Sequence, residues 1–179
     1  MKYLPRVADK MLQERLEAFG AVLIEGPKWT GKTTTAEQQA KSVIKLQNPD
    51  KVNEYLATAK TRPSLLLKGE QPRLIDEWQD APMLWDAVRT AVDETGGIPG
   101  QYILTGSNTV DKSQIRHTGT GRITRMKMYP MSLWESLEKY QYMNCSIILI
   151  MILMERQANW IYPSCFMSLV VAVGQLHYK

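Results

Sequence analysis

The stretch Gly26-Pro27-Lys28-Trp29-Thr30-Gly31-Lys32-Thr33 has the pattern G-x-x-x-x-G-K-[ST] and decides how the rest of the chain is interpreted. The apolar run Ala21–Ile24 before it has the length of a buried strand, and residues 34–41 after it form a plausible helix. Glycines between a strand and a helix let consecutive backbone N–H groups surround phosphate oxygens without side-chain obstruction. The stretch is therefore interpreted as a phosphate-binding loop of the Walker A type.

Two side chains of this loop have roles that follow from their chemistry. The ammonium group of Lys32 can reach the β- and γ-phosphates of a nucleotide, and the hydroxyl group of Thr33 can ligate Mg²⁺. The predicted nucleotide-contacting set is the loop and the next residue, namely Gly26, Pro27, Lys28, Trp29, Thr30, Gly31, Lys32, Thr33 and Thr34. The alternative is an accidental glycine-containing turn, and the agreement of motif and flanking context argues against it.

Two adjacent carboxylates follow a second apolar run. Asp76 and Glu77 lie near the end of Pro72–Trp78, which is predicted to form a short strand. Ligands of nucleotide-binding α/β sheets lie at the carboxyl ends of the strands. Asp76 is thus placed like a Walker B aspartate that holds Mg²⁺, and Glu77 like the carboxylate that polarises an attacking water. Two solvated acids at a strand end are the alternative, and the upstream loop favours the functional interpretation.

A third predicted strand, Gln101–Ser107, stops on hydroxyl residues. A polar side chain at its end is expected beside the phosphate loop, where it can sense a γ-phosphate. Ser107 is the first candidate for this sensor and Thr105 the second. A simple turn role for these hydroxyl residues is the alternative.

The polar loop Arg116–Arg122 follows that strand. Arg122, at its end, is the candidate arginine finger that acts on a phosphate held by a neighbouring subunit, and it predicts a homo-oligomer. A solvated surface arginine is the alternative. His117 has no evident partner in the sequence and is interpreted as an exposed loop residue.

Composition places limits on the class of protein. The 179 residues suit one domain with at most a small appendage, and the 44% apolar fraction suffices for an ordinary core. A formal charge of +4 does not by itself support nucleic-acid binding. Cys145 and Cys165 have no metal-ligand spacing, and the N-terminus has no apolar signal region, so a cytoplasmic protein is expected.

Strands and helices alternate along the chain. Helices are expected over Ala8–Phe19, residues 34–41, Val52–Ala59 and from Asp80 onward; strands are expected over Ala21–Ile24, Val43–Gln47, Pro72–Trp78, Gln101–Ser107 and Arg125–Tyr129. This alternation predicts an α/β fold with layers of helices around a mostly parallel sheet.

The motifs GPKWTGKTTTA, PRLIDEWQDAP, ILTGS, HTGTGRI and MYPMSLWES, in this order, resemble the prokaryotic AAA-type ATPases that carry a nuclease-like C-terminal domain of unknown function. The resemblance covers about residues 1–136. It implies a three-layer P-loop NTPase fold whose Walker B strand is not adjacent to the Walker A strand, with ATP and Mg²⁺ as ligands. It also implies the functional set Lys32, Thr33, Asp76, Glu77, Ser107 and Arg122. The helical lid and C-terminal domain of that family have no counterpart after Ser136.

Residues 137–179 differ in character from the sequence before them and are expected to form an irregular tail. Residues 146–154 are almost wholly apolar, but Glu155–Gln157 interrupts the run short of the ~20 residues that a membrane span needs. If translation is shifted so that each codon starts at the third base of the present codon, the pair Met151-Ile152 must encode Asp. One stop-free translation in this shifted frame is similar to the family's sequence after MSLWES. We therefore expect an ATP-binding domain over residues 1–136 and an out-of-frame tail over 137–179; a buried hydrophobic hairpin is the alternative.

Three functions remain open at this point. The first is an ATPase that uses Glu77 to activate water, and the second is a nucleotide-binding remnant without turnover. The third is a small-molecule phosphotransferase, which shares the phosphate loop but needs no activated water, so the Asp76-Glu77 pair argues against it.

Overall fold

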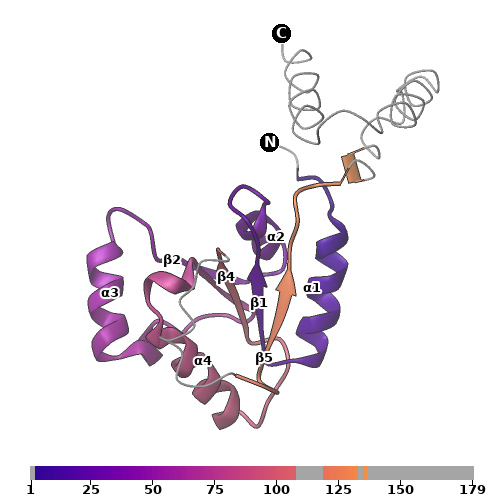
Figure 1. Cartoon of the computed structure of the whole chain (residues 1–179). Coiled ribbons are helices and arrows are strands. Elements are labelled where there is room, and N and C mark those ends of the chain that lie inside the picture. The colour runs from indigo at the N-terminus through magenta and orange to yellow at the C-terminus, as the bar shows by residue number, and fades with distance from the viewer. Residues whose placement is uncertain (1–2, 108–118, 133–134, 137–179) are drawn as a thin grey trace, which may run out of the picture. The chain divides into compact units, whose positions relative to one another are not determined.

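A computed structural model describes residues 3–107, 119–132 and 135–136 (Figure 1). Its helices are α1 (Val7–Ala18), α2 (Lys32–Glu37), α3 (Val52–Thr61) and α4 (Met83–Glu94), with 3₁₀ turns at Pro63–Leu65 and Trp78–Asp80. Its strands are β1 (Ala21–Glu25), β2 (Ser42–Lys45), β3 (Arg73–Asp76), β4 (Tyr102–Gly106) and β5 (Ile123–Lys127).

The chain divides into the units Met1–Ser136 and Leu137–Lys179. The predicted tail and His117 lie outside the described residues. Within the described ranges, none of the helices is long and apolar enough to cross a membrane.

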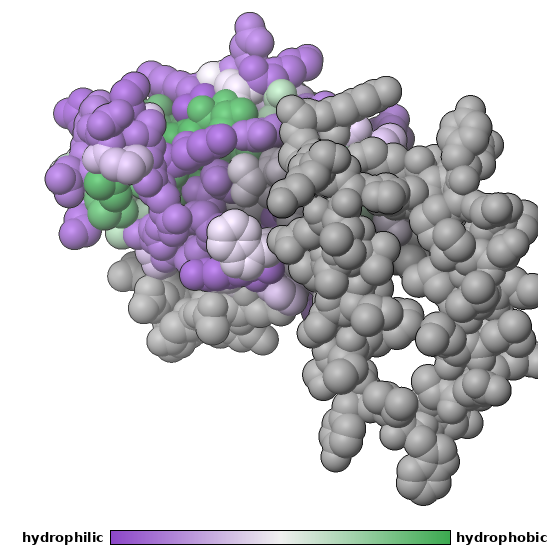
Figure 2. Space-filling model, turned by 90° about the horizontal axis from the view of Figure 1, so that it is seen from above, coloured by the Kyte–Doolittle hydropathy of each residue, from purple (hydrophilic) through white to green (hydrophobic). Residues whose placement is uncertain are grey.

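The five strands form one sheet in the order β2-β3-β4-β1-β5, and all neighbouring strands are parallel. Strand β4 thus separates β1, which leads into the phosphate loop, from β3, which ends at Asp76. This arrangement is the one implied by the family resemblance. Because all strands point the same way, their carboxyl ends meet at one edge of the sheet. In the view from above in Figure 2, the coloured surface is mostly hydrophilic, with a smaller apolar area.

Helices cover both faces of the sheet, which confirms the predicted three-layer α/β fold (Figure 1). Side chains alternate along β1: Val22 and Ile24 pack in one core cluster with residues of α1 and α2, whereas Leu23 packs in a second cluster with residues of α3 and α4. This is the period of two that a strand buried on both faces requires.

Several predicted boundaries differ from the structure by one to four residues, and for two of them the hydrogen bonds give the reason. Helix α2 ends at Glu37 rather than at residue 41, because the N–H of Lys41 donates to the carbonyl of Pro72 at 2.8 Å and the backbone has by then turned toward the sheet. Strand β5 begins at Ile123 rather than at Arg125. The Ile123 side chain is buried, and the N–H of Ala21 already donates to the Arg122 carbonyl at 3.1 Å.

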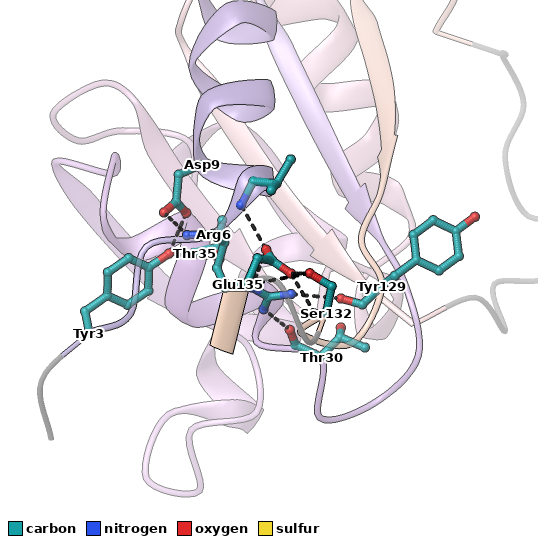
Figure 3. Close-up of polar contacts among 9 residues, drawn as sticks. Tyr3, Arg6, Asp9, Thr30, Thr35, Tyr129, Ser132 and Glu135 are labelled. Atoms are coloured by element: carbon teal, nitrogen blue, oxygen red, sulfur yellow. Dashed lines mark hydrogen bonds and ion pairs between the residues drawn. The ribbon is translucent and has the colours of Figure 1, made fainter. Parts of the chain in front are cut away.

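A buried ion pair joins the beginning and the end of the described unit (Figure 3). The Nε of Arg6 lies 3.0 Å from Oε1 of Glu135, and the two side chains are only 7% and 8% exposed. Glu135 also accepts hydrogen bonds from the backbone N–H of Val7 and from both the N–H and the hydroxyl of Ser132, at 2.7–2.9 Å. Burial alone would raise the pKa of Glu135, but these hydrogen bonds and the Arg6 guanidinium outweigh it and lower the pKa to about 2.

This lowered pKa predicts an acid-sensitive contribution to stability. As pH falls, the unfolded chain takes up a proton at Glu135 near its ordinary value of 4.5, whereas the folded chain does so only near pH 2. The stabilisation from Glu135 is therefore complete above about pH 5 and is lost between about pH 4.5 and pH 2. Between pH 7 and pH 3, we expect the unfolding free energy of Glu135→Gln to fall by roughly 2 kcal/mol less than that of the wild type.

Urea denaturation of the wild-type and variant chains between pH 7 and pH 3 measures this effect. Glu14→Gln is the control, since that carboxylate is 61% exposed and lies 3.9 Å from Lys10. Equal pH profiles for Glu135→Gln and the wild type would contradict the assignment.

Candidate functional site

The phosphate loop begins where the backbone of β1 passes very close to the chain after β5. A Cβ atom on Gly26 would lie 2.2 Å from the carbonyl oxygen of Met128, so glycine is required at this position. The N–H of Met128 donates to the carbonyl of Glu25 at 2.7 Å and holds the two segments together. At the other end of the loop, Gly31 has φ 88° and caps α2 in a left-handed conformation that favours glycine.

The backbone N–H groups of residues 28–33 donate no hydrogen bond to any residue that the structure describes. The side chain of Lys32 is 6% exposed, and its Nζ donates to the carbonyls of Gly26 and Pro27 at 3.0 and 2.8 Å. The loop therefore encloses its lysine and keeps a run of N–H donors for an external acceptor. A set of oriented N–H groups with an ammonium group beside them is suited to phosphate oxygens.

The carboxylate of Asp76 connects three elements at the carboxyl edge of the sheet. Its Oδ1 accepts a hydrogen bond from the hydroxyl of Thr33 at 2.6 Å and from the hydroxyl of Thr105 at 2.6 Å. Thr33 belongs to α2, Asp76 ends β3 and Thr105 lies in β4. The two residues predicted to hold Mg²⁺ thus contact each other directly.

The oxygen pair of Thr33 and Asp76 fits a magnesium ion, since Mg²⁺ in nucleotide sites is bound by one or two protein oxygens together with phosphates and water. Within the described ranges, no group of three or more His, Cys, Asp or Glu side chains gathers around one point. Two protein oxygens leave the other positions of an octahedral ion to phosphate and water, so the Thr33–Asp76 pair suits a metal shared with a nucleotide.

Glu77 occupies an unusual backbone conformation directly after β3. Its φ of 56° and ψ of 50° are left-handed, a region that non-glycine residues rarely adopt and that occurs often at functional sites. Its N–H donates to the Thr105 hydroxyl at 3.2 Å, and its carboxylate accepts a hydrogen bond from the side-chain amide of Gln79. The next residue, Trp78, is 1% exposed, so Glu77 is anchored on its C-terminal side as well.

The two sensor candidates differ in their surroundings. Thr105 is fully buried and connects Asp76 to the backbone of Glu77, whereas Ser107 follows β4 and is half-buried. The alternation of side chains places Thr105 and Asp76 on one face of the sheet: Thr105 lies two residues after Ile103 and Asp76 two residues after Leu74, and both apolar residues belong to the cluster covered by α1 and α2. The same alternation does not distinguish Thr105 from Ser107, which lies two residues further along the chain.

Sequence reasoning did not identify Gln79 or Arg6 as part of the site. Gln79 is two residues from Glu77, so proximity to a predicted catalytic carboxylate was an available signal. Arg6 donates to the carbonyl of Thr30 in the phosphate loop at 3.0 Å. No local pattern indicates this contact, because 24 residues separate the two.

Arg122 lies at the opposite edge of the sheet from the phosphate loop. It precedes β5, where Ile123 pairs with Ala21, whereas the loop follows Glu25, which pairs with Lys127. From Ala21 to Glu25 the strand advances four residue steps of about 3.3 Å each, so the two edges lie roughly 13 Å apart. The Arg122 side chain is 48% exposed and forms an ion pair with Asp93 at 2.6 Å. Arg122 is therefore distant from the loop of its own chain.

Comparison with known proteins identifies the family. A family model described as AAA domain matches residues 18–137, and the chain therefore belongs to the AAA domain family and is an ATP-binding module of the AAA type. The chain is also similar to a solved structure titled "Structure of C. elegans PCH-2", with 14% identity, coverage of 88% of this chain and 46% of that chain, and a TM-score of 0.39. No curated protein matches the chain.

The loop also contains a strained residue whose substitution tests the described geometry. Trp29 has φ 68°, and its side chain is 99% exposed, so no packing compensates for the left-handed conformation. We expect Trp29→Gly to be more stable than Trp29→Ala by about 1 kcal/mol, because glycine alone adopts this conformation without strain. Urea denaturation of both variants at pH 7 measures the difference, and the alanine variant controls for loss of the indole ring. A glycine variant less stable than the alanine variant would contradict the left-handed assignment.

Proposed function

We propose that this AAA domain is an Mg²⁺-dependent ATP hydrolase. The observation that carries the proposal is the double hydrogen bond of Asp76 to Thr33 and Thr105, both at 2.6 Å. This contact joins the phosphate loop to the end of β3, immediately before Glu77. The proposed phosphate-binding loop, the proposed magnesium ligands and the proposed water-activating carboxylate all lie at one edge of the sheet.

Binding is assigned to the loop. The N–H groups of residues 28–33 and the ammonium group of Lys32 are the proposed donors to the β- and γ-phosphates. Thr33 and Asp76 are the proposed magnesium ligands, and Mg²⁺ when bound supplies neutralisation of the phosphate charge. The flanking residues from Gly26 to Thr34 complete the proposed contact set.

Hydrolysis is assigned to Glu77. Its carboxylate accepts a proton from a water molecule as the water oxygen bonds to the γ-phosphorus and the bond to the ADP oxygen breaks. The products are ADP and inorganic phosphate. Two hydrogen bonds support this role: the Glu77 N–H donates to the Thr105 hydroxyl, and the Gln79 amide donates to the Glu77 carboxylate. They hold both the backbone and the carboxylate of the base in place. Ser107 and Thr105 remain the two proposed sensors of the γ-phosphate.

Assembly is assigned to Arg122. Since Arg122 lies at the edge of the sheet opposite its own phosphate loop, a finger role requires a second copy of the chain. Its exposed ion pair with Asp93 costs little to break, as exposed pairs contribute about 0–1 kcal/mol.

The first experiment separates binding from turnover. Lys32→Ala is expected to weaken Mg·ATP binding by about a hundredfold, because it removes the charge nearest the loop carbonyls and the phosphates. Glu77→Gln is expected to keep Mg·ATP binding and to lower phosphate release by at least about a hundredfold, because an amide does not accept the proton. Calorimetric titration measures the binding, and a phosphate-release assay measures the turnover.

Equal turnover in the wild type and Glu77→Gln would remove Glu77 from the mechanism. A wild type that binds ATP without releasing phosphate would instead favour a module that binds nucleotide without hydrolysing it. Phosphate transferred to a small acceptor would favour the phosphotransferase.

The second experiment tests the finger. Arg122→Ala and Glu77→Gln chains are each expected to be inactive, and their mixture is expected to regain part of the wild-type turnover, because one interface then contains both intact groups. Arg89→Ala is the matched control, since Arg89 also contacts Asp93, at 3.3 Å, but belongs to α4. No recovery on mixing, together with a monomer at all working concentrations, would contradict the finger role.

A further inference from the structure

The guanidinium group of Arg6 contacts three separate segments of the chain (Figure 3). Its Nε pairs with Glu135 at 3.0 Å, its Nη2 donates to the carbonyl of Tyr129 at 3.1 Å, and its Nη1 donates to the carbonyl of Thr30 in the phosphate loop at 3.0 Å. One buried side chain thus links the start of α1, the segment after β5 and the loop. A planar guanidinium with donors in fixed directions is suited to this, whereas the ammonium of a lysine lacks that geometry.

We propose that Arg6 is a positioning residue for the phosphate loop, and that with Glu135 it couples nucleotide binding to the docking of the segment after β5 against α1. This inference rests on nucleotide binding by the loop and adds a residue and a coupling to it.

The contact with Thr30 sets the orientation of a loop peptide. A peptide group is planar and trans, so its carbonyl and its N–H point in opposite directions. The Thr30 carbonyl points toward Arg6, and the Gly31 N–H consequently points away from it. This N–H belongs to the run of donors that no described residue uses. A rotated peptide would turn a carbonyl toward the phosphate in place of a donor, which is unfavourable for an anion.

The position of Arg6 depends in turn on Glu135. The carboxylate accepts three further hydrogen bonds, from Val7 and Ser132, so its own location is fixed by the chain on both sides. Both members of the pair are more than nine-tenths buried. Undocking of the segment that carries Tyr129 and Glu135 would leave Arg6 without two of its three partners, and the Thr30 carbonyl would lose its fixed donor.

Coupling between two events is reciprocal. If phosphate binds better to the loop when Arg6 holds it, then bound phosphate must stabilise the docked segment by the same factor. Nucleotide binding is therefore expected to slow hydrogen exchange at the backbone amides of Val7 and Ser132, which donate to Glu135 and lie outside the loop.

The test measures Mg·ADP affinity and thermal stability of the full chain. We expect Arg6→Ala to weaken Mg·ADP binding by at least about tenfold, since a hydrogen bond from a charged donor is lost. Arg6→Lys is expected to bind with an intermediate affinity. Arg15→Ala is the matched control on α1, because among the described residues the Arg15 side chain donates a hydrogen bond only to the carbonyl of Met11 in the same helix. This variant is expected to leave the affinity unchanged.

Hydrogen exchange with and without Mg·ADP tests the coupling. The protection at Val7 and Ser132 is expected in the wild type and in Arg15→Ala and is expected to be lost in Arg6→Ala. If Arg6→Ala does not fold, Arg6→Lys and Glu135→Gln provide the same comparison, because each removes part of the contact. A variant with a lower melting temperature but unchanged Mg·ADP affinity would overturn the inference alone, whereas a wild type that does not bind Mg·ADP would overturn the proposed function and the inference with it.

Discussion

A single carboxylate oxygen determines how the candidate site is assembled. Oδ1 of Asp76 accepts hydroxyl hydrogen bonds from α2 and from β4 and so holds three elements at one edge of the sheet. Hydrogen bonds to a charged acceptor contribute about 1.5–3 kcal/mol each. The two threonines reach this atom only because β4 lies between β1 and β3. The sheet order is thus a condition of the site's chemistry as well as of the fold.

The phosphate loop is held from outside as well as by its own glycines. Its first residue is pressed against the Met128 carbonyl, and its Thr30 carbonyl is held by Arg6. Both contacts come from parts of the chain far from the motif. A loop restrained in this way pays less conformational entropy when a ligand binds, which is the benefit of a preorganised site.

Much of the fold follows from local patterns. The Walker motif between a strand and a helix, and the apolar run before Asp76, predict the elements that the structure contains, because periodicity and glycine placement are local properties. Helix α2 ended early and β5 began early because hydrogen bonds to distant strands set those boundaries. The contacts of Arg6 with Glu135 and of Thr105 with Asp76 join residues that are far apart in the sequence, and no single-sequence pattern specifies such pairs. The left-handed conformation of Trp29 could not be predicted from the sequence either, since tryptophan is not a residue that indicates positive φ.

The strand order has a consequence for the way the chain acquires its structure. Strand β1 precedes the other four strands in the chain, yet both of its neighbours come late: Ala21 pairs with Tyr102 and with Ile123. Strands β2 and β3 pair with each other but reach β1 only through β4. The apolar residues of β1 therefore cannot pair within the sheet until most of the unit has been synthesised. Pairings between such distant residues form slowly and leave apolar strands open to association with other chains in the meantime. The topology that places β1, and with it the phosphate loop, between two late strands thus makes this part of the molecule one of the last to be completed.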